Sequence, residues 1–254
     1  MNRIPSVGPP GVLKAVVFDM DDTLYLERDY VLSGFRHISN LIAEDARRTP
    51  EDILTFLLSR AENPHHRGHV LELLFAEYPE IARGWEAVRL VEEYRAHTPA
   101  ISLLPGVELL LTDLRAAGAH LAVITDGVSA SQHSKAKALR LTEYFDRIVV
   151  TDDRGIEYRK PHPYAYLNVS EGFGCEARAC VYIGDNPAKD FLAPRRLGWE
   201  TVRLRLRNQL HEAAEPSSPE AAPQIECRSV AELRSTLLTR LCPSSALASR
   251  TLIP

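Results

Sequence analysis

The sequence predicts an α/β fold: a doubly wound parallel sheet with an inserted all-helical domain. Short, continuously apolar segments alternate with amphipathic helical segments over most of the chain. This pattern is typical of a parallel sheet that is covered by helices on both faces. Between residues 27 and 98 the strand pattern disappears, and apolar residues recur at helical spacing in four stretches. One strand-to-strand crossover needs one helix, so four helices indicate an inserted domain.

The expected elements follow in chain order. The first strand covers residues 14–18, and later strands are expected at 120–124, 147–150, 179–183, 200–204 and near Ile225. In the helical block, Thr49 is the expected N-cap of the second helix, with Pro50 in its first turn. Helices are also expected from Val107 to about Gly118, over 129–139 and 164–171, up to Leu197, and from Val230.

These elements divide the chain into two domains. We expect residues 1–26 and 99–254 to form the α/β core, and residues 27–98 to form the helical domain. The stretch 217–223 is rich in Pro, Ser and Ala and is expected to be a loop. Residues 243–254 have no apolar periodicity and are expected to be a mobile tail.

Composition excludes several classes of protein. The 254 residues carry a net charge of −4, so no bulk positive charge attracts nucleic acid or an anionic membrane. No apolar run is long enough to span a bilayer, and residues 1–11 lack the apolar region of a signal peptide. The four cysteines form no Cys-x-x-Cys pair, which favours reduced thiols in a cytoplasmic protein.

Polar residues that can carry chemistry follow the predicted strands. Asp19 and Asp21 come just after the first strand, and two carboxylates this close repel each other unless a cation lies between them. Thr125, Asp126 and Gly127 follow a second strand, Lys160 follows a third, and Asp185 and Asp190 follow a fourth. Because ligands bind beyond the carboxyl ends of parallel strands, we expect these residues to converge.

These residues resemble the four motifs of the haloacid dehalogenase (HAD) superfamily. Asp19-x-Asp21-x-Thr23-Leu24 is similar to the first motif, Thr125 to the second, Lys160 to the third, and Asp185 with Asp190 to the fourth. The helical block between the first two motifs is similar to the helical (C1) cap of one subfamily. The resemblance implies a Rossmann-like core with a cap domain and a phosphatase activity. Asp126 departs from the Asn that often follows the second-motif residue.

The expected roles combine the residues with this resemblance. Asp19 is ionised at neutral pH and can attack phosphorus to form an aspartyl-phosphate. The acidic cluster suits Mg²⁺; the resemblance implies that Asp19 and Asp185 bind it through side chains and Asp21 through its backbone carbonyl, while Asp190 supports the metal shell. Asp21 is expected to act as general acid and then base, with its pKa raised by neighbouring carboxylates. The expected phosphate-binding residues are Thr125, Asp126, Gly127 and Lys160.

The leading hypothesis is a Mg²⁺-dependent phosphatase that hydrolyses a small phosphorylated metabolite, either a sugar phosphate or a nucleoside monophosphate. Two alternatives remain: a phosphomutase, which keeps both aspartates, and a non-catalytic HAD-like binding protein. The presence of Asp21 disfavours a dehalogenase. The sequence leaves the pathway undecided, and also whether the protein is a monomer or a homodimer.

Three further features are weaker. A metal site is conceivable at His65, His66 and His69, although a solvated loop is the simpler interpretation. The alternation of Arg203, Arg205 and Arg207 with leucines predicts a strand with one wet face, with a basic rim as the alternative. Asp22 is expected to be a local cap rather than a catalytic group.

Overall fold

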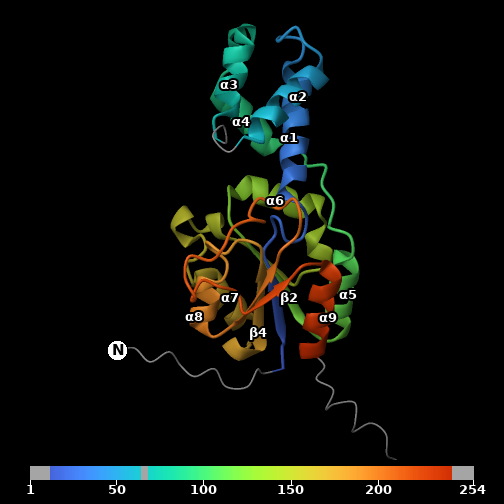
Figure 1. The fold of residues 1–254 in the computed structure, drawn as a ribbon, viewed down its shortest axis with the longest axis vertical. Coiled ribbons are helices and arrows are strands. Elements are labelled where there is room, and N and C mark those ends of the chain that lie inside the picture. Colours follow the sequence, from blue (N-terminus) through green and yellow to red (C-terminus); the bar gives the residue numbers. More distant parts are fainter. Residues whose placement is uncertain (1–11, 64–67, 242–254) are drawn as a thin grey trace, which may run out of the picture.

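The core of the protein is a six-stranded parallel sheet. The computed structural model describes residues 12–63 and 68–241, with the strand order β3-β2-β1-β4-β5-β6 (Figure 1). The strands are β1 (Ala15–Phe18), β2 (His120–Thr125), β3 (Arg147–Val150), β4 (Cys180–Gly184), β5 (Glu200–Leu204) and β6 (Ile225–Cys227). The predicted doubly wound parallel sheet is confirmed.

Helices cover both faces of this sheet. Figure 1 shows α5 (Val107–Ala116) and α9 (Val230–Leu241) on one side, and α7 (Tyr164–Phe173) and α8 (Leu192–Leu197) on the other. Helix α6 (Ser129–Ala138) follows β2. Short 3-10 turns lie between the longer elements, at Leu141–Glu143, Thr151–Asp153, Ile156–Tyr158 and Ala177–Ala179.

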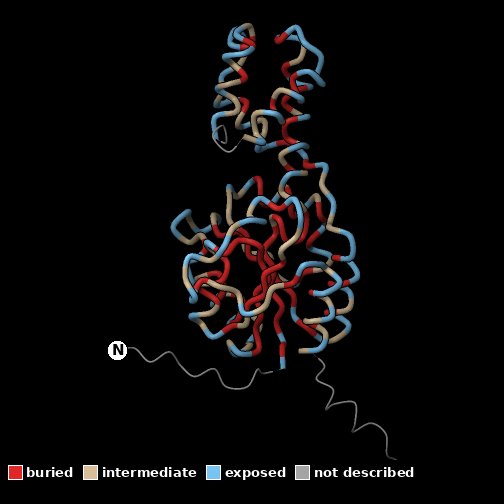
Figure 2. The backbone as a smooth tube through the Cα atoms, in the orientation of Figure 1, coloured by how far each residue is buried: buried red, intermediate tan, exposed pale blue. Residues whose placement is uncertain are grey.

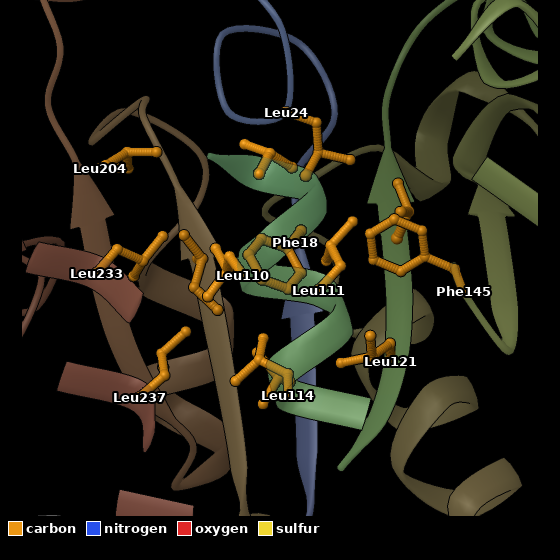
Figure 3. Close-up of a cluster of buried hydrophobic side chains, with 14 of the residues drawn as sticks. Phe18, Leu24, Leu110, Leu111, Leu114, Leu121, Phe145, Leu204, Leu233 and Leu237 are labelled. Carbon is orange, nitrogen blue, oxygen red and sulfur yellow. The ribbon is translucent and has the colours of Figure 1, made fainter. Parts of the chain in front are cut away.

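The central strand β1 is buried on both faces. Val16 and Phe18 pack into one apolar cluster with the leucines of α5, and Figure 3 shows Phe18 among Leu110, Leu111 and Leu114. The alternate residues of β1 belong to a second cluster with α7. Successive side chains of a strand point to opposite faces, so a continuously apolar strand requires this double cover. Figure 2 shows the buried residues concentrated in the sheet.

The helical block stands apart from the sheet at the top of Figure 1. It contains α1 (Glu27–Ile42), α2 (Pro50–Ala61), α3 (Val70–Glu77), a 3-10 turn (Pro79–Arg83) and α4 (Ala87–Ala96). These helices share an apolar cluster of their own, in which Ile38, Ile53 and Leu90 are fully buried. Thr49 caps α2 as predicted, in a reciprocal capping box with Asp52. None of the described helices is long and apolar enough to cross a membrane.

The chain enters and leaves the helical block at neighbouring points. The backbone N–H of Leu104, which precedes α5, donates to the carbonyl oxygen of Leu24 at 2.8 Å. Leu24 lies between β1 and α1, so this hydrogen bond joins the outgoing and returning segments. Side-chain packing reinforces the joint, because the buried Leu24 contacts the same apolar cluster as Leu103 and Leu104.

Some of the remaining predicted features lie within the described residues and others lie outside them. Residues 217–223 contain no helix or strand, as expected for a loop, and Arg195 donates hydrogen bonds to the carbonyl oxygens of Pro219 and Ala222. The predicted tail, residues 1–11, His65, His66 and Cys242 lie outside the described residues. His69 is exposed, and Cys175, Cys180 and Cys227 are free cysteines.

Candidate active site

The carboxyl ends of β1, β2 and β4 bring together polar residues from distant parts of the sequence. Asp19 follows β1, Thr125 ends β2, and Asp185 follows β4. The strand register places Phe18 opposite Val123 of β2 and Ile183 of β4, so the three strands end at the same edge of the sheet, within two residues of one another. Carboxylate oxygens of Asp19, Asp185 and Asp190 all lie within 4.8 Å of one another, and all three residues are buried.

Lys160 connects two of these carboxylates. Its Nζ atom lies 2.7 Å from Asp19 Oδ1 and 2.9 Å from Asp190 Oδ1, and it donates to the Tyr182 hydroxyl at 2.9 Å. The Lys160 side chain is completely buried. Burial alone would lower the pKa of Lys160, but the two carboxylates outweigh this effect and raise it well above its ordinary value. Lys160 therefore remains a cation.

The acidic cluster fits a divalent metal ion. Burial raises the pKa of Asp19 to about 6, although Lys160 acts in the opposite direction. Burial and the nearby Asp190 and Asp19 raise the pKa of Asp185 to about 9. Asp185 Oδ2 is buried and has no hydrogen-bond partner among the described residues. Lys160 and the nearby Lys189 offer two positive charges to three carboxylates, so a hard, oxygen-binding cation matches the remaining charge and the free oxygen.

Asp190 has a different environment from the other two carboxylates. Its Oδ2 accepts a hydrogen bond from the Asn186 backbone N–H at 2.9 Å, while its Oδ1 faces Lys160. A Cβ atom on Gly184 would lie only 2.5 Å from Asp190 Oδ2. The glycine before Asp185 thus leaves room for the Asp190 carboxylate. Asp190 is thus anchored beside Asp19 and Asp185, with one oxygen held by a backbone N–H group and the other facing Lys160.

The end of β2 and the loop after it contain three of the four predicted phosphate-binding residues, and Lys160 is the fourth. Thr125 is fully buried, and its Oγ1 has no hydrogen-bond partner among the described residues, so it can donate to a ligand. Asp126 has a bracing role: its Oδ1 accepts from Thr151 Oγ1 at 2.8 Å and from the Lys160 backbone N–H at 3.1 Å. Gly127 has a φ of 136°, a conformation that side chains rarely allow.

Asp21 is held by residues outside the predicted motifs. Lys135 Nζ lies 2.8 Å from Asp21 Oδ1, which also accepts a hydrogen bond from the Tyr25 hydroxyl, and Gln132 Nε2 donates to Oδ2 at 3.0 Å. Burial raises the pKa of Asp21, but the ion pair with Lys135 and these hydrogen bonds outweigh it, so the pKa lies below its ordinary value. The expectation that neighbouring carboxylates raise this pKa is therefore wrong.

A comparison with known protein families identifies the family of this chain. Residues 13–198 match the haloacid dehalogenase-like hydrolase family. The chain belongs to this family. The match spans all four motifs, so the predicted family and enzyme class are confirmed.

Relatives of this HAD-like hydrolase include several phosphatases. The chain is 25% identical over 197 residues to a glyceraldehyde 3-phosphate phosphatase from Pyrococcus abyssi, covering 75% of this chain and 81% of the relative. It is 29% identical over 173 residues to a phosphoserine phosphatase from Thermus thermophilus, covering 67% and 65%. A HAD family hydrolase from Deinococcus radiodurans, solved with bound phosphate and sodium, shares the fold with a TM-score of 0.62 and 21% identity, over 92% and 99% of the two chains.

Two other predictions about the HAD-like core had different outcomes. Asp22 is a local cap as expected: its carboxylate accepts from the backbone N–H groups of Glu27 at 2.8 Å and Leu210 at 2.7 Å. The expected wet face of β5 is wrong for Arg203, which is almost fully buried. Arg203 donates to the backbone carbonyl of Asp185 at 2.9 Å and to that of His211 at 2.8 Å, so it braces the loop that follows β4.

The sequence patterns did not predict that Gln132 and Lys135 contact Asp21. Gln132 and Lys135 are three positions apart on α6, so they share one face of the helix. Both are buried polar residues on a helix that directly follows the Thr125 motif. The spacing was available in the sequence, but the pattern does not show that this face meets Asp21 rather than solvent.

Proposed function

We propose that the protein is a Mg²⁺-dependent phosphatase that hydrolyses a small phosphomonoester through an aspartyl-phosphate on Asp19. The observation that carries the proposal is the buried cluster of Asp19, Asp185 and Asp190 around Lys160. Thr125, at the end of the neighbouring strand β2, has a hydroxyl group without a hydrogen-bond partner in the described part of the chain. A nucleophile, a fixed cation and a free donor in one buried place are what phosphoryl transfer to a carboxylate needs.

The roles follow from these positions. Asp19 attacks phosphorus, Lys160 offsets the negative charge that gathers there, and Thr125 donates to a phosphoryl oxygen. Asp21 donates a proton to the departing oxygen and later takes one from the attacking water. Because Lys135 lowers the pKa of Asp21 in the free protein, this role requires the negative charge of the bound phosphate to raise that pKa again. Asp126 and Gly127 shape the loop that receives the phosphoryl group.

The metal would be held by Asp19 and Asp185 through their side chains and by Asp21 through its backbone carbonyl, with Asp190 in support. A bound Mg²⁺ supplies positive charge to the phosphoryl oxygens.

We propose a sugar phosphate or a nucleoside monophosphate as substrate. Two relatives are phosphatases of small phosphorylated metabolites by name, glyceraldehyde 3-phosphate and phosphoserine phosphatases, and this supports the class of substrate. The proposed cap domain, residues 27–98, would select the leaving group as it closes over the site. We propose a cytoplasmic location, which agrees with the free thiols of the three cysteines in the described part of the chain.

The test is phosphate release from a panel of sugar phosphates and nucleotides, with Mg²⁺ and with EDTA. We expect release that requires Mg²⁺ and is lost in Asp19→Asn, but is retained in Glu171→Gln, a control at an exposed position on α7. Full activity of Asp19→Asn would exclude Asp19 as the nucleophile. Substrate isomerisation without net phosphate release would instead identify a phosphomutase, and binding without turnover would favour a non-catalytic protein.

A further inference from the structure

A buried lysine outside the four motifs lies between the helical block and Asp21. Lys135 on α6 is 4% exposed, and its Nζ lies 2.8 Å from Asp21 Oδ1. The same Nζ lies 4.2 Å from the centroid of the Tyr30 ring on α1. A lysine is rarely buried this completely without a specific partner, and here it has two.

Lys135 is part of a set of contacts that leaves the Asp21 carboxylate little freedom. Lys135 and the Tyr25 hydroxyl bind Oδ1, and Gln132 binds Oδ2. A carboxylate that is hydrogen-bonded through both oxygens cannot rotate without breaking one of these contacts. A general acid must be within hydrogen-bond reach of the leaving oxygen, so the orientation of Asp21 bears directly on the rate.

Tyr30 is in turn fixed within the helical block. Its ring packs edge-to-face against Tyr94 of α4, with centroids 5.5 Å apart at 83°, and its centroid lies 5.0 Å from that of His97. Tyr30 is buried, so its ring stays close to the Lys135 ammonium group. Contacts therefore run without a break from the helical block through Tyr30 and Lys135 to Asp21.

We propose that Lys135 is a positioning residue, held by Tyr30, that orients the Asp21 carboxylate toward the leaving oxygen of the substrate. This rests on the proposed phosphatase function. As the Asp19–phosphorus bond forms, the bond from phosphorus to the leaving oxygen breaks, and that oxygen takes its proton from Asp21. In the second half, water attacks phosphorus, its proton goes to Asp21, and the Asp19–phosphorus bond breaks. Lys135 exchanges no proton in either half.

The experiment compares two kinds of substrate. An alkyl phosphate needs its leaving oxygen protonated, whereas p-nitrophenyl phosphate releases a stable anion and depends little on a general acid. We expect Lys135→Met to lower kcat/KM for the alkyl phosphate about 100-fold, within the range that general acid catalysis supplies, and to lower it less than about five-fold for p-nitrophenyl phosphate. The loss should lie in kcat, and Lys135→Arg should recover part of it.

Lys137→Met is the matched control, because Lys137 lies on the same helix but is exposed. Equal losses on the two substrates would overturn the proposal, and so would a rise in KM with kcat unchanged, which would make Lys135 a substrate anchor.

A second variant pair tests the role of Tyr30 without touching Asp21. Tyr30→Phe keeps the aromatic ring and Tyr30→Leu removes it. We expect only Tyr30→Leu to increase the difference between the two substrates, and its effect should be non-additive with Lys135→Met. Additive effects would overturn the link through Lys135. Failure of the proposed function has a separate signature: no release by the wild type, or an unchanged substrate difference in Asp21→Asn.

Discussion

Replacing Asp185 with asparagine should stabilise the metal-free protein at neutral and alkaline pH. Asp185 is 3% exposed, and Asp190 and Asp19 are close to it. Its pKa in the folded protein is about 9, against an ordinary value of 3.8. Between these two values the folded protein retains a proton that the unfolded chain has lost. Stability in EDTA should therefore fall as the pH rises from about 4 to about 9.

The size of the effect follows from the same shift. At pH 7.5 the unfolded carboxyl group is almost four pH units above its ordinary pKa of 3.8, and each unit corresponds to about 1.36 kcal/mol. The ceiling is thus about 5 kcal/mol. Relaxation around the carboxylate and water entry reduce it, so we expect Asp185→Asn to gain about 2 kcal/mol at pH 7.5. For a chain of this length that is a rise in Tm of about 4–8 °C.

The assay is thermal unfolding of wild type, Asp185→Asn and the exposed control Glu171→Gln, in EDTA and in Mg²⁺, from pH 5 to pH 9. The gain of Asp185→Asn in EDTA should grow with pH. Mg²⁺ should raise the Tm of the wild type but not that of Asp185→Asn, which loses a ligand. The reasoning is refuted if Asp185→Asn is less stable than the wild type in EDTA at every pH.

Three further substitutions test the surroundings of the site. Gly184→Ala would place a methyl group against Asp190, so we expect the Mg²⁺ concentration that gives half-maximal activity to rise about ten-fold. An unchanged Mg²⁺ concentration at half-maximal activity would contradict the close contact between residue 184 and Asp190. Asp22→Ala leaves two backbone N–H groups without their acceptor and should cost about 2–4 kcal/mol in urea unfolding, with a smaller loss for Asp22→Asn. Thr49→Ala removes the capping box of α2 and should cost about 1 kcal/mol without changing kcat; a fall in kcat would show that α2 acts on the site.

Much of the fold could be predicted because the parallel strands are continuously apolar. The bounds of β3 and β5 agree with the prediction, β1 and β2 differ by one residue at one end, and β4 is shifted by one residue at both ends. The rule that ligands bind beyond the carboxyl ends of parallel strands was sufficient to predict that Asp19, Thr125 and Asp185 lie close together. The Thr49 N-cap could also be predicted from the sequence. Thr can accept a hydrogen bond from one of the backbone N–H groups that the first turn of any helix leaves unpaired.

The failures have a common physical cause. Periodicity shows which face a residue is on, but not whether a polar side chain on that face meets water or a buried partner. Arg203 was expected on a solvent-exposed face, but its side chain is buried and donates to two backbone carbonyl groups. The pKa of Asp21 was predicted from its neighbours in sequence, whereas Lys135, more than a hundred residues away, sets its direction.

The hydrogen bond between Leu24 and Leu104 has a consequence for how this enzyme can change. With its two ends joined at the base, the helical block is a branch off the core and not a link within it, so its length and sequence can vary without altering the spacing of the catalytic strands. Loop-closure entropy rises only slowly with length, so larger or smaller blocks impose little penalty on the sheet. A new specificity can arise by exchange of this one segment, while the chemistry beneath it stays constant.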